Sequence, residues 1–341
     1  MSEELLTTPA TIFSRLITDL QRARESIDME YYIFAPDRTG RAFSEILCRK
    51  ARQGLRVRLL VDGLGSRRLS RPMRERMLAS GVDILSYQPF SHNRNHRKMT
   101  IIDSRIAHVG GVNIADRYVV GNNLGTWYDV QLRIENDRVA ELAELFDYDC
   151  MLCSGLRVVA PQPSARQGVD YYWSECNGGC AMPQLLEDVI EGAEHSLTLI
   201  SPYFMPPRRT LDMLSDAVAR GVRITIIVPE RCDIWALDDV MRHYVGRAQL
   251  RGIDMLITRS AFVHAKLALV DGCRTVLGSA NLDSRSLYIT RELMVSTTRR
   301  DVCQAAGHFI ARLREISTPP LERELHSIIP SLITRLFEPV L

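Results

Sequence analysis

The chain has 341 residues, of which 46% are hydrophobic and 25% are charged, and its formal net charge is +2. This is an ordinary globular composition, and the small net charge implies no bulk polyelectrolyte partner. No apolar run approaches the roughly 18 residues that a membrane-spanning helix needs, so we expect none. The opening residues Ser2, Glu3 and Glu4 do not form the basic and apolar regions of a signal peptide.

The two halves of the chain show the same succession of predicted elements. Each half has an apolar strand, then a helix closed by a glycine, then two further short strands. In the first half these are 29–36, the helix before Gly54, 57–61 and 82–85. In the second half they are 199–206, the helix before Gly221, 222–228 and 253–256. The offset between matching positions stays between 167 and 171 residues. We therefore interpret the chain as two diverged copies of one unit.

Strands that alternate with helices predict an α/β fold with helices on both faces of each sheet. We expect two mixed or mostly parallel sheets, related by a pseudo-twofold axis that brings equivalent loops together. The predicted organisation is a first lobe over 1–155, a linker over 156–168, a second lobe over 169–315 and a C-terminal amphipathic segment over 316–341. Apolar residues in that last segment recur from Leu325 to Leu341 with the spacing of one helical face.

A short polar motif, H-x-K-x-x-x-x-D, occurs once in each copy. Its residues are His96, Lys98 and Asp103 in the first copy and His264, Lys266 and Asp271 in the second. Side chains at i and i+2 of a strand point to the same face, so each imidazole is expected beside an ammonium group. An asparagine follows each histidine by 17 residues, at Asn113 and Asn281, within glycine-containing sequences. The agreement with an independent repeat makes a chance match an unsatisfactory explanation.

The use of lysine points to the same positions. Of the 43 basic residues, 40 are arginine, and the three lysines are Lys50, Lys98 and Lys266. Lysine carries a compact charge on a rotatable stem, whereas arginine carries a wide planar fork. A tight site for a phosphate oxygen is a reason to keep lysine.

The eight cysteines do not indicate a metal site. Cys150 and Cys153 form one C-x-x-C, with Cys176 and Cys180 nearby, but no histidine follows at the spacing of a zinc site. We expect reduced, structural thiols, no bound metal and no cofactor.

These motifs resemble those of the phospholipase D superfamily from about residue 8 to residue 315. The sequence over 278–287 is similar to bacterial cardiolipin synthases in particular, as are 127–129 and 133–135. The resemblance implies two α/β lobes with the active site in the cleft between them. It also implies a metal-independent, two-step exchange at a phosphodiester through a phosphohistidine.

The resemblance also implies a role for each motif residue. His96 is expected to be the nucleophile and His264 the general acid. The nonbridging phosphate oxygens are assigned to Lys98, Lys266, Asn113 and Asn281. The carboxylates that orient the imidazoles match Asp129 and Glu292, while Asp103 and Asp271 are expected to brace the fold. The family's usual Asn-Phe-Glu is replaced here by Thr290-Arg291-Glu292, which leaves the local packing open.

Three functions are compatible with this chemistry. The leading hypothesis is cardiolipin synthesis, in which the phosphatidyl group of one phosphatidylglycerol passes to another and glycerol is released. The alternatives are hydrolysis of phospholipids and cleavage of nucleic acid. We do not expect a nucleic-acid partner, because the pI is near 8.1 and basic residues are not interleaved with aromatic ones.

A membrane surface with anionic phospholipid is the expected partner. Arg67, Arg68 and Arg71, on an expected loop, are assigned to anionic headgroups. We expect peripheral contact with the cytoplasmic face of the inner membrane, unless an anchoring segment precedes this sequence. The C-terminal segment is expected either to lie in the bilayer interface or to pack on a lobe or a second subunit. The sequence leaves the oligomeric state open.

Overall fold

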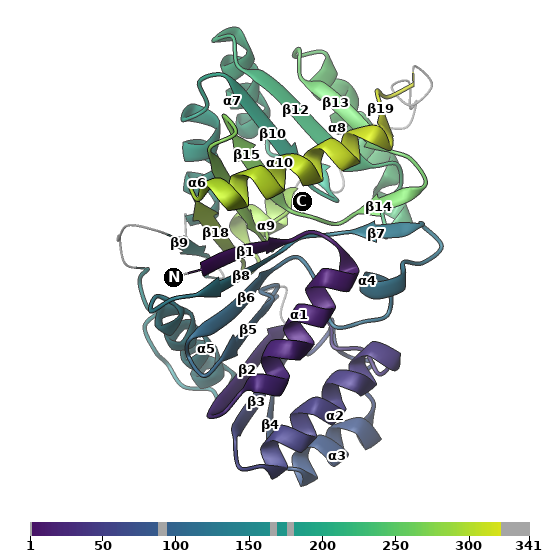
Figure 1. Ribbon diagram of the computed structural model, residues 1–341. Helices are drawn as coiled ribbons and strands as arrows, with labels where there is room; N and C mark the ends of the chain where they lie inside the picture. The colour runs from purple at the N-terminus through teal and green to yellow at the C-terminus, as the bar shows by residue number, and fades with distance from the viewer. Residues whose placement is uncertain (1, 88–93, 164–168, 176–180, 322–341) are drawn as a thin grey trace.

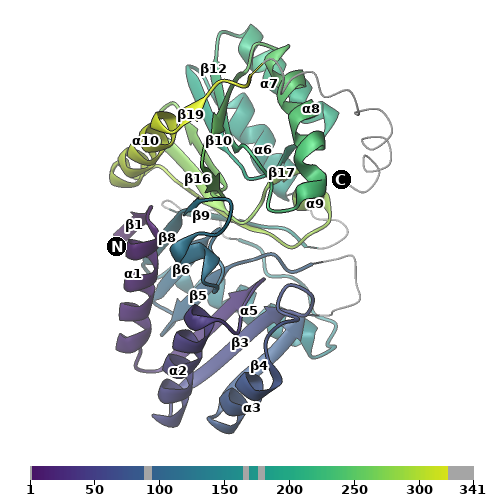
Figure 2. The ribbon, with the colours of Figure 1, turned by 90° about the vertical axis from the view of Figure 1, so that its right-hand side faces the viewer.

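A computed structural model of the protein describes residues 2–87, 94–163, 169–175 and 181–321. The apolar positions from Leu325 to Leu341, together with Cys176 and Cys180, lie outside the described residues. The chain folds into two α/β lobes, one above the other in Figure 1 and again in the view turned by 90° (Figure 2). Among the described residues, no helix combines the length and hydrophobicity needed to cross a bilayer.

The first lobe is built on a seven-stranded sheet in the order β1-β8-β6-β5-β2-β3-β4. Its strands are β1 (Ser2–Leu6), β2 (Ser26–Tyr31), β3 (Arg56–Asp62), β4 (Val82–Tyr87), β5 (Met99–Ile102), β6 (Ile106–Gly110) and β8 (Gln131–Glu135). Its long helices are α1 (Pro9–Arg22), α2 (Arg38–Arg52), α3 (Arg71–Ala79) and α5 (Val139–Cys153).

The second lobe repeats this plan on an eight-stranded sheet in the order β19-β13-β12-β10-β15-β16-β18-β9. Its strands are β9 (Asp170–Trp173), β10 (Ser196–Ile200), β12 (Arg223–Pro229), β13 (Asp254–Thr258), β15 (Leu267–Val270), β16 (Arg274–Gly278), β18 (Leu293–Thr297) and β19 (Ser317–Thr318). Its long helices are α6 (Ala181–Glu191), α7 (Arg208–Ala219), α8 (Asp238–Gln249) and α10 (Arg300–Glu315).

Both sheets are mixed, one of the two arrangements that the sequence predicts, and most of the pairings in each sheet are antiparallel. The strand–helix units make the parallel sets β2-β3-β4 and β10-β12-β13. The motif strands β5 and β15 then run antiparallel to β2 and β10, and each continues through a hairpin into β6 or β16. A hairpin needs only a short turn, whereas a parallel neighbour needs a long crossover.

The glycines that close the first helix of each unit act as the sequence predicts. Gly54 follows α2 with φ +91°, and Gly221 follows α7 with φ +92°. This left-handed conformation is open to glycine at little steric cost, so the chain turns directly into β3 and β12. The near identity of the two turns supports the interpretation of a duplicated unit.

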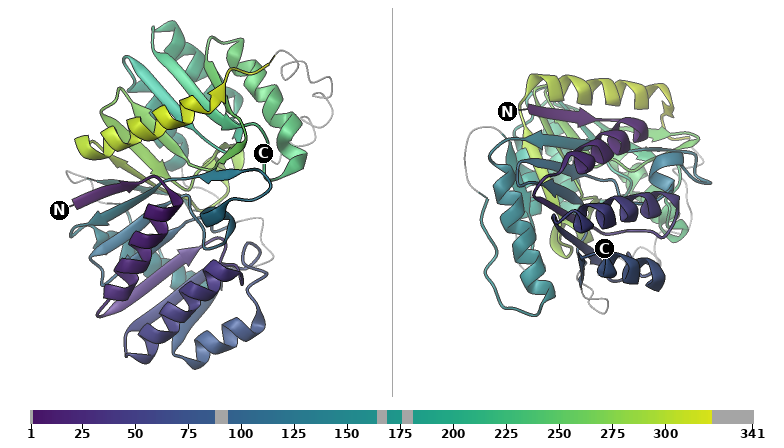
Figure 3. Two further views of the ribbon diagram at one scale, coloured as in Figure 1. Left: turned by 45° about the vertical axis from the view of Figure 1, so that its right-hand side comes forward. Right: turned by 60° about the horizontal axis from the view of Figure 1, so that its bottom comes forward.

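Three hydrophobic cores hold the molecule together. One lies between the first sheet and helices α1 and α2, and a second lies between the second sheet and helices α6, α7 and α8. The third is shared by the lobes and includes side chains of α5, of α10 and of the facing strands of both sheets. Helix α10 also lies beside β1 of the first lobe (Figure 3). Separating the lobes would therefore expose a continuous apolar core to water.

Short segments also cross between the lobes. Strand β7 (Thr126–Tyr128) of the first lobe pairs in parallel with β14 (Ala261–Val263) of the second. Asn95, just before the first motif, forms an isolated parallel bridge with Arg291. Within the second lobe, β11 (Phe204–Met205) pairs with β17 (Leu282–Asp283), which leads into α9 (Ser284–Tyr288). The two crossings place the histidine of one lobe beside the carboxylate segment of the other.

The motif aspartates lie in equivalent turns after the motif strands, away from the histidines. Asp103 accepts hydrogen bonds from the backbone N–H groups of Arg24, Glu25 and Ser26, at 2.8–3.2 Å. Asp271 accepts from Glu194, His195 and Ser196, at 2.6–2.9 Å. Both aspartates have positive φ, 52° and 49°. Each carboxylate thus ties the hairpin to the start of the neighbouring strand, β2 or β10.

This geometry predicts that Asp103→Ala destabilises the protein without removing its chemistry. Three N–H groups lose their acceptor, and alanine tolerates positive φ less well than aspartate, so we expect a loss of about 1–3 kcal/mol. Asp103→Asn, which keeps an oxygen and tolerates the turn, should lose less. Urea unfolding measures the stability, and turnover of a phosphodiester per folded molecule measures the activity. A fully stable Asp103→Ala without turnover would place the residue in the reaction instead.

Candidate active site

The two motifs meet where the crossing segments join the lobes. The backbone N–H of His96 donates to the carbonyl of Arg291 at 2.9 Å, and that of His264 donates to the carbonyl of Tyr128 at 2.7 Å. Arg291 precedes Glu292 and Tyr128 precedes Asp129 in the sequence. Each motif histidine therefore lies next to a candidate orienting carboxylate of the other lobe. These backbone hydrogen bonds alone place each histidine side chain close to the carboxylate side chain of the other lobe.

Each imidazole takes its carboxylate from the opposite lobe. Nδ1 of His96 lies 3.0 Å from both carboxylate oxygens of Glu292, and Nδ1 of His264 lies 2.7 Å from Oδ2 of Asp129. A carboxylate at Nδ1 holds the proton there, which leaves Nε2 free for chemistry. The sequence identified both carboxylates but did not indicate that the pairs cross.

The two carboxylates are held differently by their own lobes. Glu292 also accepts hydrogen bonds from the hydroxyls of Ser279, at 2.5 Å, and Thr290, at 2.8 Å. Burial alone would raise the pKa of Glu292, but His96, Lys98 and Ser279 together lower it below its usual value. This carboxylate is therefore held in its ionised form.

Asp129 has a sparser set of donors. Besides His264 it accepts from the backbone N–H of Val130 at 2.8 Å, and burial raises its pKa to about 6. A Cβ atom at Gly111 would lie 2.4 Å from Oδ1 of Asp129, so glycine is required for this approach. The second copy has Ser279 at the matching position, where its hydroxyl binds Glu292 instead. The copies have diverged in the way that they hold the carboxylate.

Both lysines are buried, with 1% of their surface exposed, and each lies beside its motif histidine. Nζ of Lys98 donates to the carbonyl of His96, and Nζ of Lys266 donates to that of His264 at 2.6 Å. Nζ of Lys266 also lies 3.2 Å from Nε2 of His264. Burial lowers the pKa of Lys98 to about 7 and that of Lys266 to about 8.

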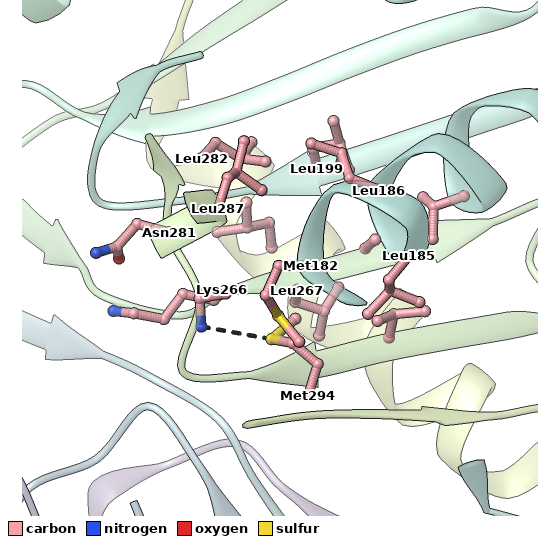
Figure 4. A pocket seen from close by; sticks show the side chains of 15 residues that line it. Met182, Leu185, Leu186, Leu199, Lys266, Leu267, Asn281, Leu282, Leu287 and Met294 are labelled. Carbon is pink, nitrogen blue, oxygen red and sulfur yellow. Dashed lines mark hydrogen bonds between the residues drawn. The ribbon is translucent and has the colours of Figure 1, made fainter. Parts of the chain in front are cut away.

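An apolar wall behind Lys266 accounts for part of this desolvation. In Figure 4, Lys266 and Asn281 point to one side, and the leucines and methionines that line the rest of the pocket lie on the other. Such surroundings disfavour an uncompensated charge, so the charged form of each lysine is stabilised strongly when an anion binds next to it. Oδ1 of Asn281 is buried without a hydrogen-bond partner among the described residues.

The matching asparagine is engaged within the protein. Oδ1 of Asn113 accepts from the backbone N–H of Ile33 at 2.9 Å, and its Nδ2 donates to the hydroxyl of Tyr118 at 2.6 Å. An amide nitrogen has two hydrogens, so one donor of Asn113 is left for a ligand. The sequence assigned equal roles to the two asparagines, whereas the structure makes Asn281 the freer of the pair.

Aromatic rings enclose both imidazoles, and of these the sequence drew attention only to Trp127. Tyr32 packs edge-on against His96, with ring centroids 5.1 Å apart. Tyr118 and Trp127 lie 5.3 and 5.4 Å from the ring of His264. The side chain of His96 is 17% exposed and that of His264 is 7% exposed. Burial lowers the pKa of His96, and it lowers that of His264 well below its ordinary value, so both imidazoles are neutral at neutral pH.

A buried charge cluster beneath the site was also missed. Arg97, the middle residue of the first motif, and Arg291 both pair with the carboxylate of Asp149, and both also pair with Glu175. Arg291 thus takes the place of an aromatic residue in the family's usual sequence without leaving its charge unpaired. The cluster joins α5 and the segment just after β9 to the two segments that carry His96 and Glu292.

The three arginines assigned to headgroups are not placed alike. Arg67 and Arg68 line a pocket of about 540 Å³ that also contains Tyr32, the ring that packs on His96. Arg71 was expected on a loop but is the first residue of α3, where it pairs with Glu75 at 2.7 Å. Pro72 favours a helix start there, which the sequence reading overlooked. Among the described residues, no group of three or more His, Cys, Asp or Glu side chains is placed to hold a metal ion.

Comparison with known families identifies the family. A family model described as "Cardiolipin synthase, PLD-like domain" matches residues 16–149 and 186–314. The chain belongs to this family. The probable cardiolipin synthase of Bacillus subtilis (strain 168) is 31% identical over 320 residues, covering 89% of this chain and 64% of the relative. The cardiolipin synthase of Geobacillus kaustophilus (strain HTA426) is 30% identical over 366 residues, covering 99% of this chain and 72% of the relative.

Solved structures agree with the two-lobed fold. The phosphatidylserine synthase of Haemophilus influenzae Rd KW20 aligns with a TM-score of 0.81 at 15% identity, over 99% of this chain and 92% of that one. The polyphosphate kinase of Porphyromonas gingivalis aligns with a TM-score of 0.67 at 17% identity, over 99% of this chain and 52% of that one. At these identities the likeness concerns the fold alone.

The pKa shifts predict a bell-shaped pH dependence of kcat/KM. A nucleophilic His96 must be neutral, so activity should fall with decreasing pH through its lowered pKa and through the value of about 6 at Asp129. The lysines and an acidic His264 must be charged, so activity should fall with increasing pH, first through the lowered pKa of His264 and further between about 7 and about 8 through the pKa values of the two lysines. Initial rates in neutral-detergent micelles measure this.

The alkaline limb of kcat should lie at higher pH than that of kcat/KM, because the bound phosphate stabilises both ammonium groups. A kcat/KM that stays constant up to pH 9 or above would show that the lysines in the free protein are not desolvated.

Proposed function

We propose that the chain is a phosphatidyltransferase that makes cardiolipin from two molecules of phosphatidylglycerol and releases glycerol. The observation that carries the proposal is the meeting of two His–Lys pairs at the lobe interface, each imidazole oriented by a carboxylate. The names of the relatives, which match most of this chain, supply the lipid class. No cofactor takes part in the reaction as proposed.

In the first step, Nε2 of His96 attacks the phosphorus of the donor lipid. Glu292 occupies Nδ1 of His96, so Nε2 carries the lone pair, and the greater exposure of this ring suits a group that meets substrate. The P–N bond forms as the P–O bond to the glycerol headgroup breaks. Lys98 and Lys266 offset the charge on the phosphate, and Asn281 and the remaining donor of Asn113 bind its oxygens.

His264 supplies the proton that the departing glycerol needs. In the free protein its pKa is lowered, but an anionic phosphodiester beside Lys266 adds the negative charge that the site lacks, which favours imidazolium. In the second step, neutral His264 takes the proton of the acceptor's hydroxyl. The new P–O bond forms, the P–N bond breaks and His96 is regenerated.

Two rival functions make use of the same centre. A lipid hydrolase differs only in that water completes the second step. A nuclease would need a continuous basic groove. Ten Lys or Arg residues lie from Arg49 to Arg76, but carboxylates interrupt their charge: Arg58 pairs with Asp28 and Asp147, Arg71 with Glu75 and Arg76 with Glu45. This pairing supports a lipid substrate over nucleic acid.

The proposed partner is the surface of an anionic membrane, reached peripherally at the cytoplasmic face of the inner membrane. Exposed apolar side chains support this contact. Trp235 and Ile234 are 84% and 50% exposed, and Trp235 lines a cavity beside the lobe interface. Val120, on α4 (Arg117–Val120) of the other lobe, is 80% exposed. Tryptophan is favoured at membrane–water interfaces.

The product test compares phosphatidylglycerol vesicles with single-stranded DNA. We expect equimolar cardiolipin and glycerol from the vesicles and intact DNA, with products identified by mass spectrometry. His96→Ala and His264→Ala should each lower the rate at least about a thousandfold, because the two residues act as one catalytic unit. Phosphatidic acid as the main product would favour the hydrolase, and cut DNA would favour the nuclease.

The covalent step can be tested with a phosphatidyl ester of p-nitrophenol. This leaving group needs no proton, so His264→Ala should release about one equivalent of nitrophenol and then stall, because no base activates the acceptor. Mass mapping should find the phosphatidyl group on His96. His96→Ala, the matched control, should show no burst. A burst in His96→Ala, or a label on His264 of the wild-type protein, would contradict the assigned roles.

A further inference from the structure

Arg117, the first residue of α4, lies between two cavities that open beside the catalytic centre. The first, the arginine pocket, has a volume of about 540 Å³ and is lined by Tyr32, Arg67, Arg68 and Arg117, among others. The second, of about 770 Å³, is lined by Arg117 from the first lobe and by Asp233 and Trp235 from the second. Arg117 is the residue that the two linings have in common.

The guanidinium of Arg117 is held close to both imidazoles through aromatic rings. Its central carbon lies 5.3 Å from the ring centroid of Tyr118 and 5.5 Å from that of Trp127, the two rings that flank His264. Across the arginine pocket, Tyr32 flanks His96. Stacking of this kind fixes the plane of the fork, and a hydrogen bond with Tyr118 is one of the contacts that raise the pKa of Arg117 against the effect of burial.

One N–H group of Arg117 lacks an acceptor among the described residues. Its Nε is buried and has no hydrogen-bond partner in the part of the chain that the structure describes. In the arginine pocket, Asp37 accepts from the backbone N–H groups of Gly40 and Asp116. In the second cavity, Glu230 pairs with Arg259 and Asp238 accepts from the backbone N–H of Cys232. Asp233 accepts from the hydroxyl of Tyr203 and lies near enough to Arg117 to help raise the pKa that burial alone would lower. A buried donor without an acceptor costs stability, so it indicates a site that an acceptor fills on binding.

The proposed reaction needs a second anion-binding site. The acceptor phosphatidylglycerol is itself a phosphodiester, and its phosphate stays one glycerol unit away from the hydroxyl that attacks. Lys98 and Lys266 already offset the charge of the phosphate that reacts. Without another cation, the acceptor would be repelled by the phosphate carried on His96, in surroundings where charges are poorly screened.

We infer that Arg117, with Arg67 and Arg68, binds the nonreacting phosphate of the acceptor and so selects an anionic lipid alcohol over water or a neutral alcohol. This inference rests on the proposed transferase function and names the acceptor's binding site. A planar fork suits a phosphate that does not change its geometry, because it can donate two parallel hydrogen bonds. The exposed Arg67 and Arg68 supply further positive charge along the same pocket.

The test measures how the phosphatidyl group on His96 is partitioned between two competing acceptors, phosphatidylglycerol and glycerol. Neutral-detergent micelles contain phosphatidylglycerol, and labelled glycerol is added to the solution. Cardiolipin reports the anionic acceptor, and labelled phosphatidylglycerol reports exchange with the neutral one. Both products need the same donor and the same binding to the micelle surface, so an effect on either cancels in their ratio. Labelled glycerol 3-phosphate in a parallel arm distinguishes recognition of a phosphate from recognition of the whole lipid.

We expect Arg117→Gln to lower the ratio of cardiolipin to exchanged phosphatidylglycerol at least about tenfold, with transfer to glycerol 3-phosphate lowered similarly relative to glycerol. The double variant Arg67→Gln/Arg68→Gln, which alters only exposed side chains, should lower the ratio about threefold or more. Arg105→Gln, in the exposed turn between β5 and β6, is the matched control for one lost surface charge. Thermal unfolding checks the fold of each variant.

The outcomes separate the inference from the function on which it rests. A wild-type protein that forms neither product contradicts the proposed transferase. A wild type that forms both, with equal losses of both in Arg117→Gln, would show that this arginine only supports His264 through Trp127 and Tyr118. If Arg117→Gln does not fold, the double variant decides, and an unchanged ratio there overturns the inference.

Discussion

The contacts between each motif histidine and the carboxylate of the opposite lobe are the constraint on which the rest of the site depends. The distances are 3.0 Å for the partly buried pair His96–Glu292 and 2.7 Å for the buried pair His264–Asp129, and in each case backbone pairing between the lobes precedes the pair along the chain. A buried charge without its partner costs several kcal/mol, so the lobes have one favourable relative placement. Neither lobe contains a complete site, and the shared apolar core maintains the arrangement that completes it.

Duplication by itself would give two equivalent histidines, whereas the proposed chemistry needs a nucleophile and an acid. The difference arises from neighbours. Hydroxyls of Ser279 and Thr290 hold Glu292 ionised beside His96, while Asp129, packed against Gly111, keeps a raised pKa beside His264. The asparagines have diverged as well, since Asn113 is bound within its lobe and Oδ1 of Asn281 is left without a partner among the described residues. The two halves share the geometry of the histidine–carboxylate pair and differ at a few neighbouring positions.

The sequence predicted the features that have a local signal and missed those that depend on distant contacts. The short strands and the glycines at Gly54 and Gly221 were predictable because periodicity and positive φ are local properties. Mixed sheets were among the expected arrangements, but which strands run antiparallel was not predictable, because a strand's direction depends on which neighbour it finds. The crossing of the carboxylates and the cluster around Asp149 join residues up to 196 positions apart. One signal was available: Arg97 occupies the buried position that the second copy gives to Ala265, and a buried arginine requires a carboxylate.

The division between lysine and arginine follows from the same geometry. All three lysines are buried, and the one outside the motifs, Lys50, donates to the carbonyls of Gln21 and Ala23 where α1 ends. Arginine is used where a planar group is fixed in place, as in the paired hydrogen bonds of Arg58 to Asp28 or the stacking of Arg117 on Trp127. A phosphate under attack changes from tetrahedral to trigonal bipyramidal, and a rotatable ammonium can follow its oxygens. A phosphate that only holds the acceptor keeps its shape, so a rigid fork is the better partner. The same chemistry would therefore account for lysine at the phosphorus that reacts in the proposed transfer and for arginine at the inferred acceptor phosphate.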